Sequence, residues 1–120
     1  MRTTWLRALI ACAWLAFSAI PTLASAAEVR KITLKANKYD WIPASIQVKV
    51  GQTVELTLVS LDVPHAIASQ QLGIPSTHFK KNQPAKVTFT PTETGTFRFK
   101  CSKYCGSGHK KMVGQIVVVP

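Results

Sequence analysis

The side chains best suited to chemistry lie in residues 101–112. Two thiols (Cys101 and Cys105), one imidazole (His109) and one thioether (Met112) fall within these twelve residues. Thiolate and thioether sulfur are soft donors that suit copper(I), and imidazole suits copper in either oxidation state. The segment has no Asp or Glu, which a calcium or magnesium site would need. Two glycines argue against a continuous helix, so we expect a copper redox site on a loop.

Two other uses of the same cysteines stay open. Cys101 and Cys105 are close enough in a curved loop to form a disulfide, as paired cysteines in exported proteins usually do. A disulfide would leave His109 and Met112 without a role. A tetrahedral zinc site is the second alternative, although zinc prefers Cys and His without Met.

The spacing Cys-Ser-x-x-Cys-Gly-x-x-His-x-x-Met resembles the binuclear copper A loop of cytochrome c oxidase subunit II, a motif shared with nitrous oxide reductase. In that family two cysteine sulfurs bridge two copper ions, and each copper carries one histidine. A methionine sulfur and a backbone carbonyl are weak outer ligands. The resemblance implies two copper ions bridged by Cys101 and Cys105. It also implies that His109 and Met112 are terminal ligands and that the carbonyl belongs to Lys103.

A second histidine has to come from elsewhere in the chain. The segment Asp-Val-Pro-His, which ends at His65, resembles the Asp-Val-x-His segment of the same family, so the resemblance implies that His65 is this ligand. His78 matches no motif and is interpreted as an ordinary strand or loop histidine. Asp62 is a candidate partner for a histidine ring, although an acidic residue near basic loops is usually just solvated.

The elements that must position these residues are strands. Apolar and polar residues alternate along several runs, and a last run is continuous and β-branched; these are 46–50, 54–58, 86–89, 97–100 and 115–119. Turn signals rich in Gly and Pro separate the runs. No stretch of ten or more residues after the N-terminal segment shows helical periodicity. We therefore expect an all-β sandwich of seven or eight strands, and the resemblance implies the Greek-key form of a cupredoxin.

Residues 1–26 have the order of a secretory signal peptide. Two arginines precede an apolar run at 8–20, and Ala-Ser-Ala at 24–26 offers a cleavage site. A retained membrane anchor is the alternative, but a spanning helix needs about 20 residues. Lipidation at Cys12 is a third reading, weakened by the short apolar stretch before it. We expect one mature domain, residues 27–120, in the periplasm or otherwise exported.

The balance of charge is strongly basic. The chain has 15 basic and five acidic residues, and 13 of the basic ones follow residue 26, so the mature charge is about +8. The basic residues are scattered rather than grouped in a block, and an exported protein rarely meets nucleic acid, so no nucleic-acid partner is expected. Basicity fits steering toward an acidic protein partner or an anionic membrane face. No catalytic constellation is apparent, so neither an enzyme nor a small-molecule substrate is expected.

The resemblance implies a soluble, exported carrier that passes single electrons between respiratory proteins, such as a cytochrome and a terminal oxidase. Subunit II usually has Glu where this chain has Lys103, so a role of that side chain toward an oxidase is not carried over. A copper carrier for oxidase assembly and a mononuclear cupredoxin that leaves out Cys101 or Cys105 are the alternatives. Thiol–disulfide exchange is disfavoured, because no helix is available to lower a thiol pKa.

Overall fold

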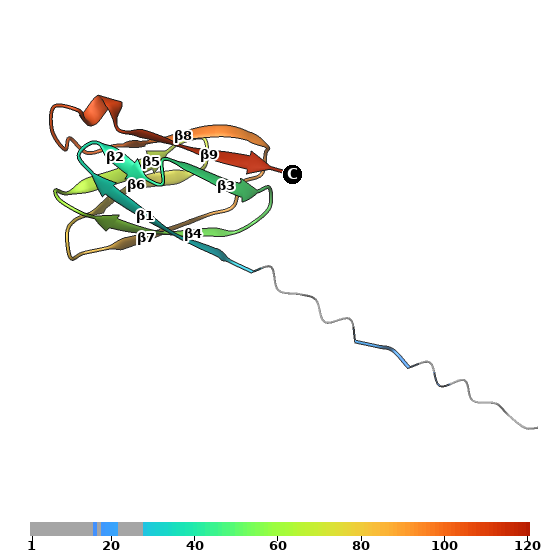
Figure 1. Ribbon diagram of the computed structural model, residues 1–120. Helices are drawn as coiled ribbons and strands as arrows, with labels where there is room; N and C mark the ends of the chain where they lie inside the picture. The colour runs from blue at the N-terminus through green and yellow to red at the C-terminus, as the bar shows by residue number, and fades with distance from the viewer. Residues whose placement is uncertain (1–15, 17, 22–27) are drawn as a thin grey trace, which may run out of the picture.

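The computed structural model describes residues 16, 18–21 and 28–120. Within this part of the chain, strands occupy almost all of the regular structure, and the expected all-β sandwich is confirmed (Figure 1). The elements are β1 (Arg30–Asn37), β2 (Asp40–Ile42), β3 (Ser45–Lys49), β4 (Val54–Ser60), β5 (His65–Ser69), β6 (Ile74–Phe79), β7 (Ala85–Phe89), β8 (Gly95–Cys101), the short 3-10 helix η1 (His109–Lys111) and β9 (Val113–Val119).

The predicted signal peptide lies outside the described residues, apart from 16 and 18–21. No helix in the described part of the chain is long and apolar enough to cross a membrane.

The strands form two sheets that face each other. One has the order β2-β1-β4-β7 and the other the order β3-β9-β8-β5-β6. Two pairs are parallel, β1 with β4 and β3 with β9, and the remaining pairs are antiparallel. Parallel neighbours need long connections, which here pass through the opposite sheet. Residues 102–112, which we call the ligand loop, join the antiparallel neighbours β8 and β9, and β3 and β5 from earlier in the chain flank this pair.

The five expected runs correspond to β3, β4, β7, β8 and β9, but the described chain has nine strands rather than seven or eight. One reason is β2, which has three residues and pairs only with β1. The other is β6, which begins at Ile74, inside a segment whose Gly and Pro predict a turn. The turn there is shorter, because Ser69 already pairs with Ile74.

The core fills the space between the two sheets. Leu34, Leu56 and Ile116 are fully buried, and for Leu56 the alternation of its run with polar residues predicts this. Trp41 is buried as well, and its ring meets Phe99 edge to face with 5.2 Å between centroids. The core thus reaches from the sheet centres to the strand ends where the cysteines lie.

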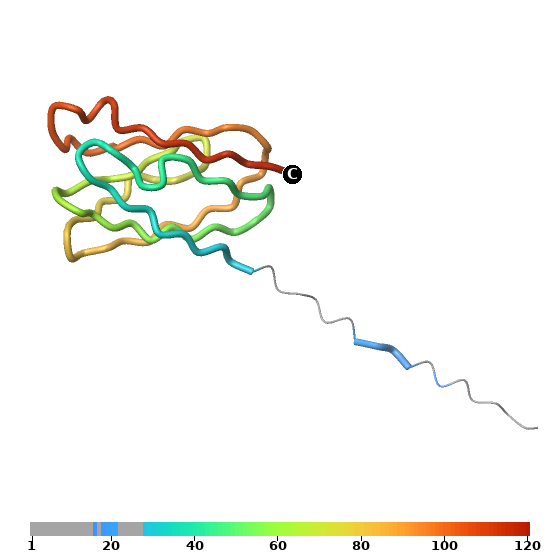
Figure 2. The backbone as a smooth tube through the Cα atoms, in the orientation of Figure 1, coloured from blue at the N-terminus to red at the C-terminus, as the bar shows by residue number. Residues whose placement is uncertain are grey.

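Four loops meet at one end of the sandwich, which we call the cysteine end. They comprise residues 38–39, 61–64, 80–84 and 102–112 (Figures 1 and 2). The described domain begins and finishes at the opposite end, where Arg30 pairs with Val54 and Val119 pairs with Lys49. Every residue singled out as a ligand lies at the cysteine end.

Candidate metal centre

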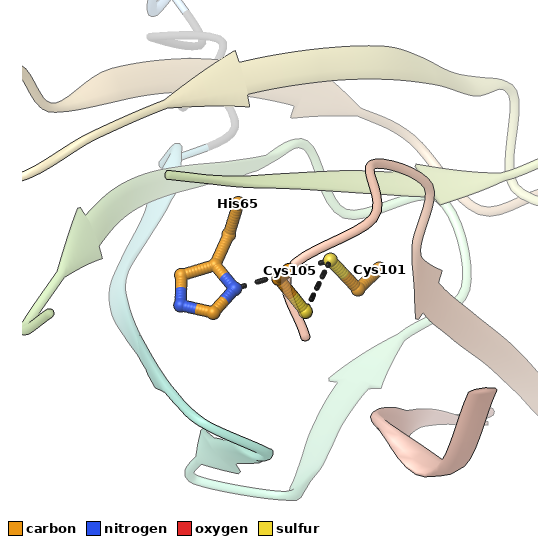
Figure 3. A group of neighbouring side chains, drawn as sticks. All are labelled: His65, Cys101 and Cys105. Atoms are coloured by element: carbon orange, nitrogen blue, oxygen red, sulfur yellow. Dashed lines mark hydrogen bonds between the residues drawn. The ribbon is translucent and has the colours of Figure 1, made fainter. Parts of the chain in front are cut away.

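Two histidines and two cysteines converge at the cysteine end. His65 is the first residue of β5 and Cys101 the last of β8, while Cys105 and His109 lie on the following loop. The two sulfur atoms are 3.6 Å apart. His65 Nδ1 lies 3.9 Å from Cys101 Sγ, and His109 Nδ1 lies 3.8 Å from Cys105 Sγ. Each sulfur therefore has its own imidazole nitrogen beside it (Figure 3 shows His65 and both cysteines).

The two remaining predicted ligands complete the group. The carbonyl oxygen of Lys103 lies 3.1 Å from Cys101 Sγ, and Met112 Sδ lies 3.8 Å from Cys105 Sγ. All six residues named from the sequence are thus neighbours in space. His78 lies exposed on β6 and takes no part in this cluster.

The cysteines are not joined to each other. Both are free thiols, and the 3.6 Å between their sulfur atoms is far longer than the roughly 2.05 Å of a disulfide bond. The structure therefore does not adopt the disulfide alternative.

Because this group of residues is buried, ionised cysteines in it would be unfavourable without a nearby positive charge. His65 and Met112 are fully buried, and the two cysteines are nearly so. Burial raises the pKa of the Cys105 thiol to about 11, and the neighbouring thiol of Cys101 and the carboxylate of Asp62 add to this rise. A bound cation would favour the charged form and so offset the cost of burial.

The donor set fits copper. The donor atoms of His65, Cys101 and Cys105 all lie within 4.8 Å of one another, and no carboxylate in the described part of the chain joins this group. A buried set of thiols, imidazoles and a thioether is soft and does not suit a hard cation. The residues present are therefore those that a copper site needs.

Asp62 holds the far side of the His65 ring. Its Oδ1 accepts hydrogen bonds from His65 Nε2 at 2.9 Å and from the Val63 N–H at 2.6 Å, and its Oδ2 accepts one from the Lys38 N–H at 2.7 Å. Partial burial alone would raise the pKa of Asp62, but these three donors hold it below its usual value. The ionised carboxylate keeps the ring proton on Nε2, which leaves Nδ1 free to act as a ligand.

The β1–β2 turn supports the ligand loop from the other sheet. The side chain of Tyr39 packs directly on Gly106 and Gly108: an added Cβ would overlap the hydroxyl oxygen at Gly106 and ring atoms at Gly108. Trp41 Nε1 donates a hydrogen bond to the Met112 carbonyl at 3.2 Å. Sequence reasoning did not find Tyr39 as a support; the two glycines were the available signal, since glycine permits such close approach.

Comparison with known proteins agrees with the resemblance. The cupredoxin-like domain family matches residues 8–118. Cytochrome c oxidase subunit 2 of Thermus thermophilus is 30% identical over 80 residues, which is 67% of this chain and 58% of that protein. A second subunit 2 sequence from the same species is matched over 47% of its length, so the chain spans about half the length of these curated relatives.

Solved structures share the fold. The periplasmic domain of subunit II of cytochrome oxidase (CoxB) from Bradyrhizobium japonicum superposes with a TM-score of 0.69 at 20% identity, covering 75% of this chain and 83% of that one. The metal-binding domain of the Cu(I)-exporting P-type ATPase CopA of Streptococcus pneumoniae, solved with Cu(I), gives 0.61 at 25% identity, covering 79% and 99%. With its two-sheet sandwich and its match over most of the sequence, this chain belongs to the cupredoxin-like domain family and resembles cytochrome c oxidase subunit 2.

Proposed function

We propose that this chain is an exported electron-transfer protein with a binuclear copper A centre. The ligands would be His65, Cys101, the Lys103 carbonyl, Cys105, His109 and Met112. The observation that carries the proposal is the pairing of each cysteine sulfur with its own imidazole nitrogen, at 3.9 Å and 3.8 Å. Two bridging thiolates with one histidine on each side form a donor set for two metals rather than one.

When bound, the two copper ions would supply a one-electron couple shared between them. The protein's part is to keep the ligands in place and to exclude water. The Cys101 N–H donates to the Met112 carbonyl at 3.2 Å, which closes the two ends of the loop on each other. The Ser102 N–H donates to the Ala66 carbonyl at 2.9 Å and ties the loop to β5, next to His65. Ligands held so rigidly would rearrange little when an electron arrives or leaves.

The relatives support a proposal for the compartment and the partners. The Bradyrhizobium structure is a periplasmic domain of an oxidase subunit, which supports an exported location for this chain. Cleavage after residue 26 remains part of the proposal. The partners would be redox proteins, such as a cytochrome or a terminal oxidase. The chain itself would carry electrons and catalyse no reaction on a small molecule.

The test is copper reconstitution of residues 27–120. We expect two copper ions per chain and an electron paramagnetic resonance spectrum in which one unpaired electron is split by two equivalent copper nuclei. One copper per chain, or a spectrum split by a single copper nucleus, would overturn the binuclear assignment.

A copper carrier is the second candidate, because the Streptococcus domain solved with Cu(I) belongs to a copper exporter and almost all of it superposes on this chain. A carrier should give Cu(I) to a metal-free acceptor within minutes. An electron carrier should keep both coppers through repeated cycles of reduction and oxidation. Copper content after ten such cycles, in the presence of a Cu(I) chelator, separates the two functions.

A further inference from the structure

The lysines of this protein are concentrated at the cysteine end. Six exposed lysines lie in the four loops that meet there: Lys38, Lys80, Lys81, Lys103, Lys110 and Lys111. The only acidic residue of these loops is Asp62, whose carboxylate is occupied by the three hydrogen bonds described above. The loops around the candidate metal centre therefore present a nearly uncompensated positive charge.

The opposite end of the sandwich is different. Its connecting loops, residues 50–53, 70–73 and 90–94, contain no Lys or Arg and one acidic residue, Glu93. Arg30, Lys31 and Lys49 lie on strands near this end, but every lysine that lies in a loop of the described domain is at the cysteine end. Such a separation orients an approaching charged protein before contact and raises its association rate.

A groove opens among these lysines, beside the ligands. It has a volume of about 570 Å³, and its lining includes Pro64, His78, Phe79, Lys80, Pro84 and Lys103. Pro64 precedes His65 in the chain, and the Lys103 carbonyl lies 3.1 Å from Cys101 Sγ. A molecule seated in the groove would contact one residue of the proposed ligand set and the chain neighbour of another.

Exposed apolar side chains lie beside the groove. Tyr104 is 74% exposed and follows Lys103, and Leu61 is 43% exposed in the loop that carries Pro64. This face therefore combines exposed apolar side chains with charged ones, as protein interfaces do. It is also concave, which suits a protruding side chain better than the flat surface of a membrane.

We propose that this groove, with the six lysines around it, is the docking surface for an acidic redox protein, one of whose Asp or Glu side chains enters the groove between Lys80 and Lys103. The inference rests on the proposed function, because it names the chemistry of the electron-transfer partner. A lipid headgroup could satisfy the same lysines but could not exchange an electron with the centre.

The test uses the copper-loaded protein and two probes, an acidic and a basic soluble c-type cytochrome. Stopped-flow electron exchange with the acidic cytochrome should be at least tenfold faster at about 10 mM than at about 200 mM ionic strength. The double variant Lys80→Glu/Lys81→Glu should lose about tenfold or more of the rate at low ionic strength. The matched control Lys31→Glu/Lys49→Glu makes the same change of charge at two exposed residues near the opposite end and should lose less than about twofold.

Three results would overturn the proposal. They are a faster rate with the basic cytochrome, equal losses in the control and the double variant, and no salt dependence. Co-sedimentation with phosphatidylglycerol vesicles that the double variant abolishes, together with no effect of that variant on the cytochrome, would assign the lysines to a membrane.

Docking is also measured apart from electron transfer. Amide chemical-shift changes on adding the acidic cytochrome should cluster at residues 61–64, 80–84 and 102–104. If these chemical-shift changes appear while two-copper loading fails, the proposed electron transfer is wrong and the proposed docking surface is retained. If copper loading and electron exchange with a small mediator succeed but the chemical-shift changes are absent, the proposed docking surface is wrong and the proposed electron transfer is retained.

Discussion

Asp62 and the sulfur of Cys101 lie at opposite edges of the His65 ring. Asp62 Oδ1 lies 2.9 Å from Nε2, while Nδ1 lies 3.9 Å from Cys101 Sγ. The same carboxylate accepts the backbone N–H groups of Lys38 and Val63, so it joins the β1–β2 turn to the loop before β5. The orientation of the imidazole is therefore set before any metal binds.

Replacing Asp62 by Asn should weaken copper binding. The amide oxygen can still accept from His65 Nε2, but the amide NH₂ group then faces the Lys38 N–H, donor against donor. We expect a loss of about 10- to 100-fold in Cu(I) affinity, measured by competition with a chelator, and about 1–3 kcal/mol in the free energy of unfolding. Asp40→Asn makes the same charge change at an exposed residue and should alter neither quantity. If both variants lose the same copper affinity and stability, the loss comes from the change of net charge and not from the hydrogen bonds of Asp62.

Gly108→Ala should destabilise the domain through Tyr39. The new Cβ would overlap Tyr39 Cδ2, so the ring or the ligand loop must move. Overpacking of this kind costs about 1–3 kcal/mol, which urea unfolding can measure. In a Tyr39→Ala background the same substitution should cost much less. An unchanged cost there would show that the backbone of Gly108, and not the aromatic ring, is the reason for glycine.

Cys101→Ser and Cys105→Ser should each abolish the two-copper spectrum. A hydroxyl is a poor bridge for soft metal ions, and both sulfur atoms are shared in the proposed centre. The copper-to-protein ratio and the electron paramagnetic resonance spectrum are the measurements. Ser102→Ala, in the same loop but outside the ligand set, should keep both. A site that keeps its spectrum after one of the two cysteine substitutions would be mononuclear.

The copper-free domain should lose stability in alkaline solution. Burial, with help from Cys101 and Asp62, raises the pKa of Cys105 to about 11 from an ordinary value of 9.0. The fold thus favours the neutral thiol, and this stabilisation is complete below pH 9 and is lost as the pH rises toward 11. Urea unfolding at about pH 7, 9 and 10.5 should show the decline. Cys105→Ser removes the titrating group and should flatten this part of the profile.

Four of the five predicted strands carry a strong alternation, and β5, which was not predicted, does not. β4 and β7 alternate strictly because one side of each faces the core, and their burial follows the pattern. β5 has four buried residues out of five, including His65, and so shows no period of two. The parallel pairing of β1 with β4 could not be predicted from the sequence, because it depends on how distant strands pack and not on local preference.

The six proposed ligands lie close together, and they could be named from the sequence because their spacing matches a specific motif. Their supports were harder to find. Asp62 could be named as a candidate partner, yet only the structure shows that Lys38 and Val63 share its carboxylate with His65. Tyr39 lies 67 or more residues before the glycines that it contacts, and no local pattern records a contact of that range.

Arg30 and Val119 both lie at the end of the sandwich remote from the cysteines. The domain can therefore be tethered through either terminus with its candidate metal centre facing outward. On an electrode, attachment through the C-terminus would leave the cysteine end, with its lysines, facing the solution. Electrons would then have to cross the full length of the strands to reach the electrode. A fused redox partner would need a linker long enough to run along the whole side of the sandwich before it could reach the cysteines.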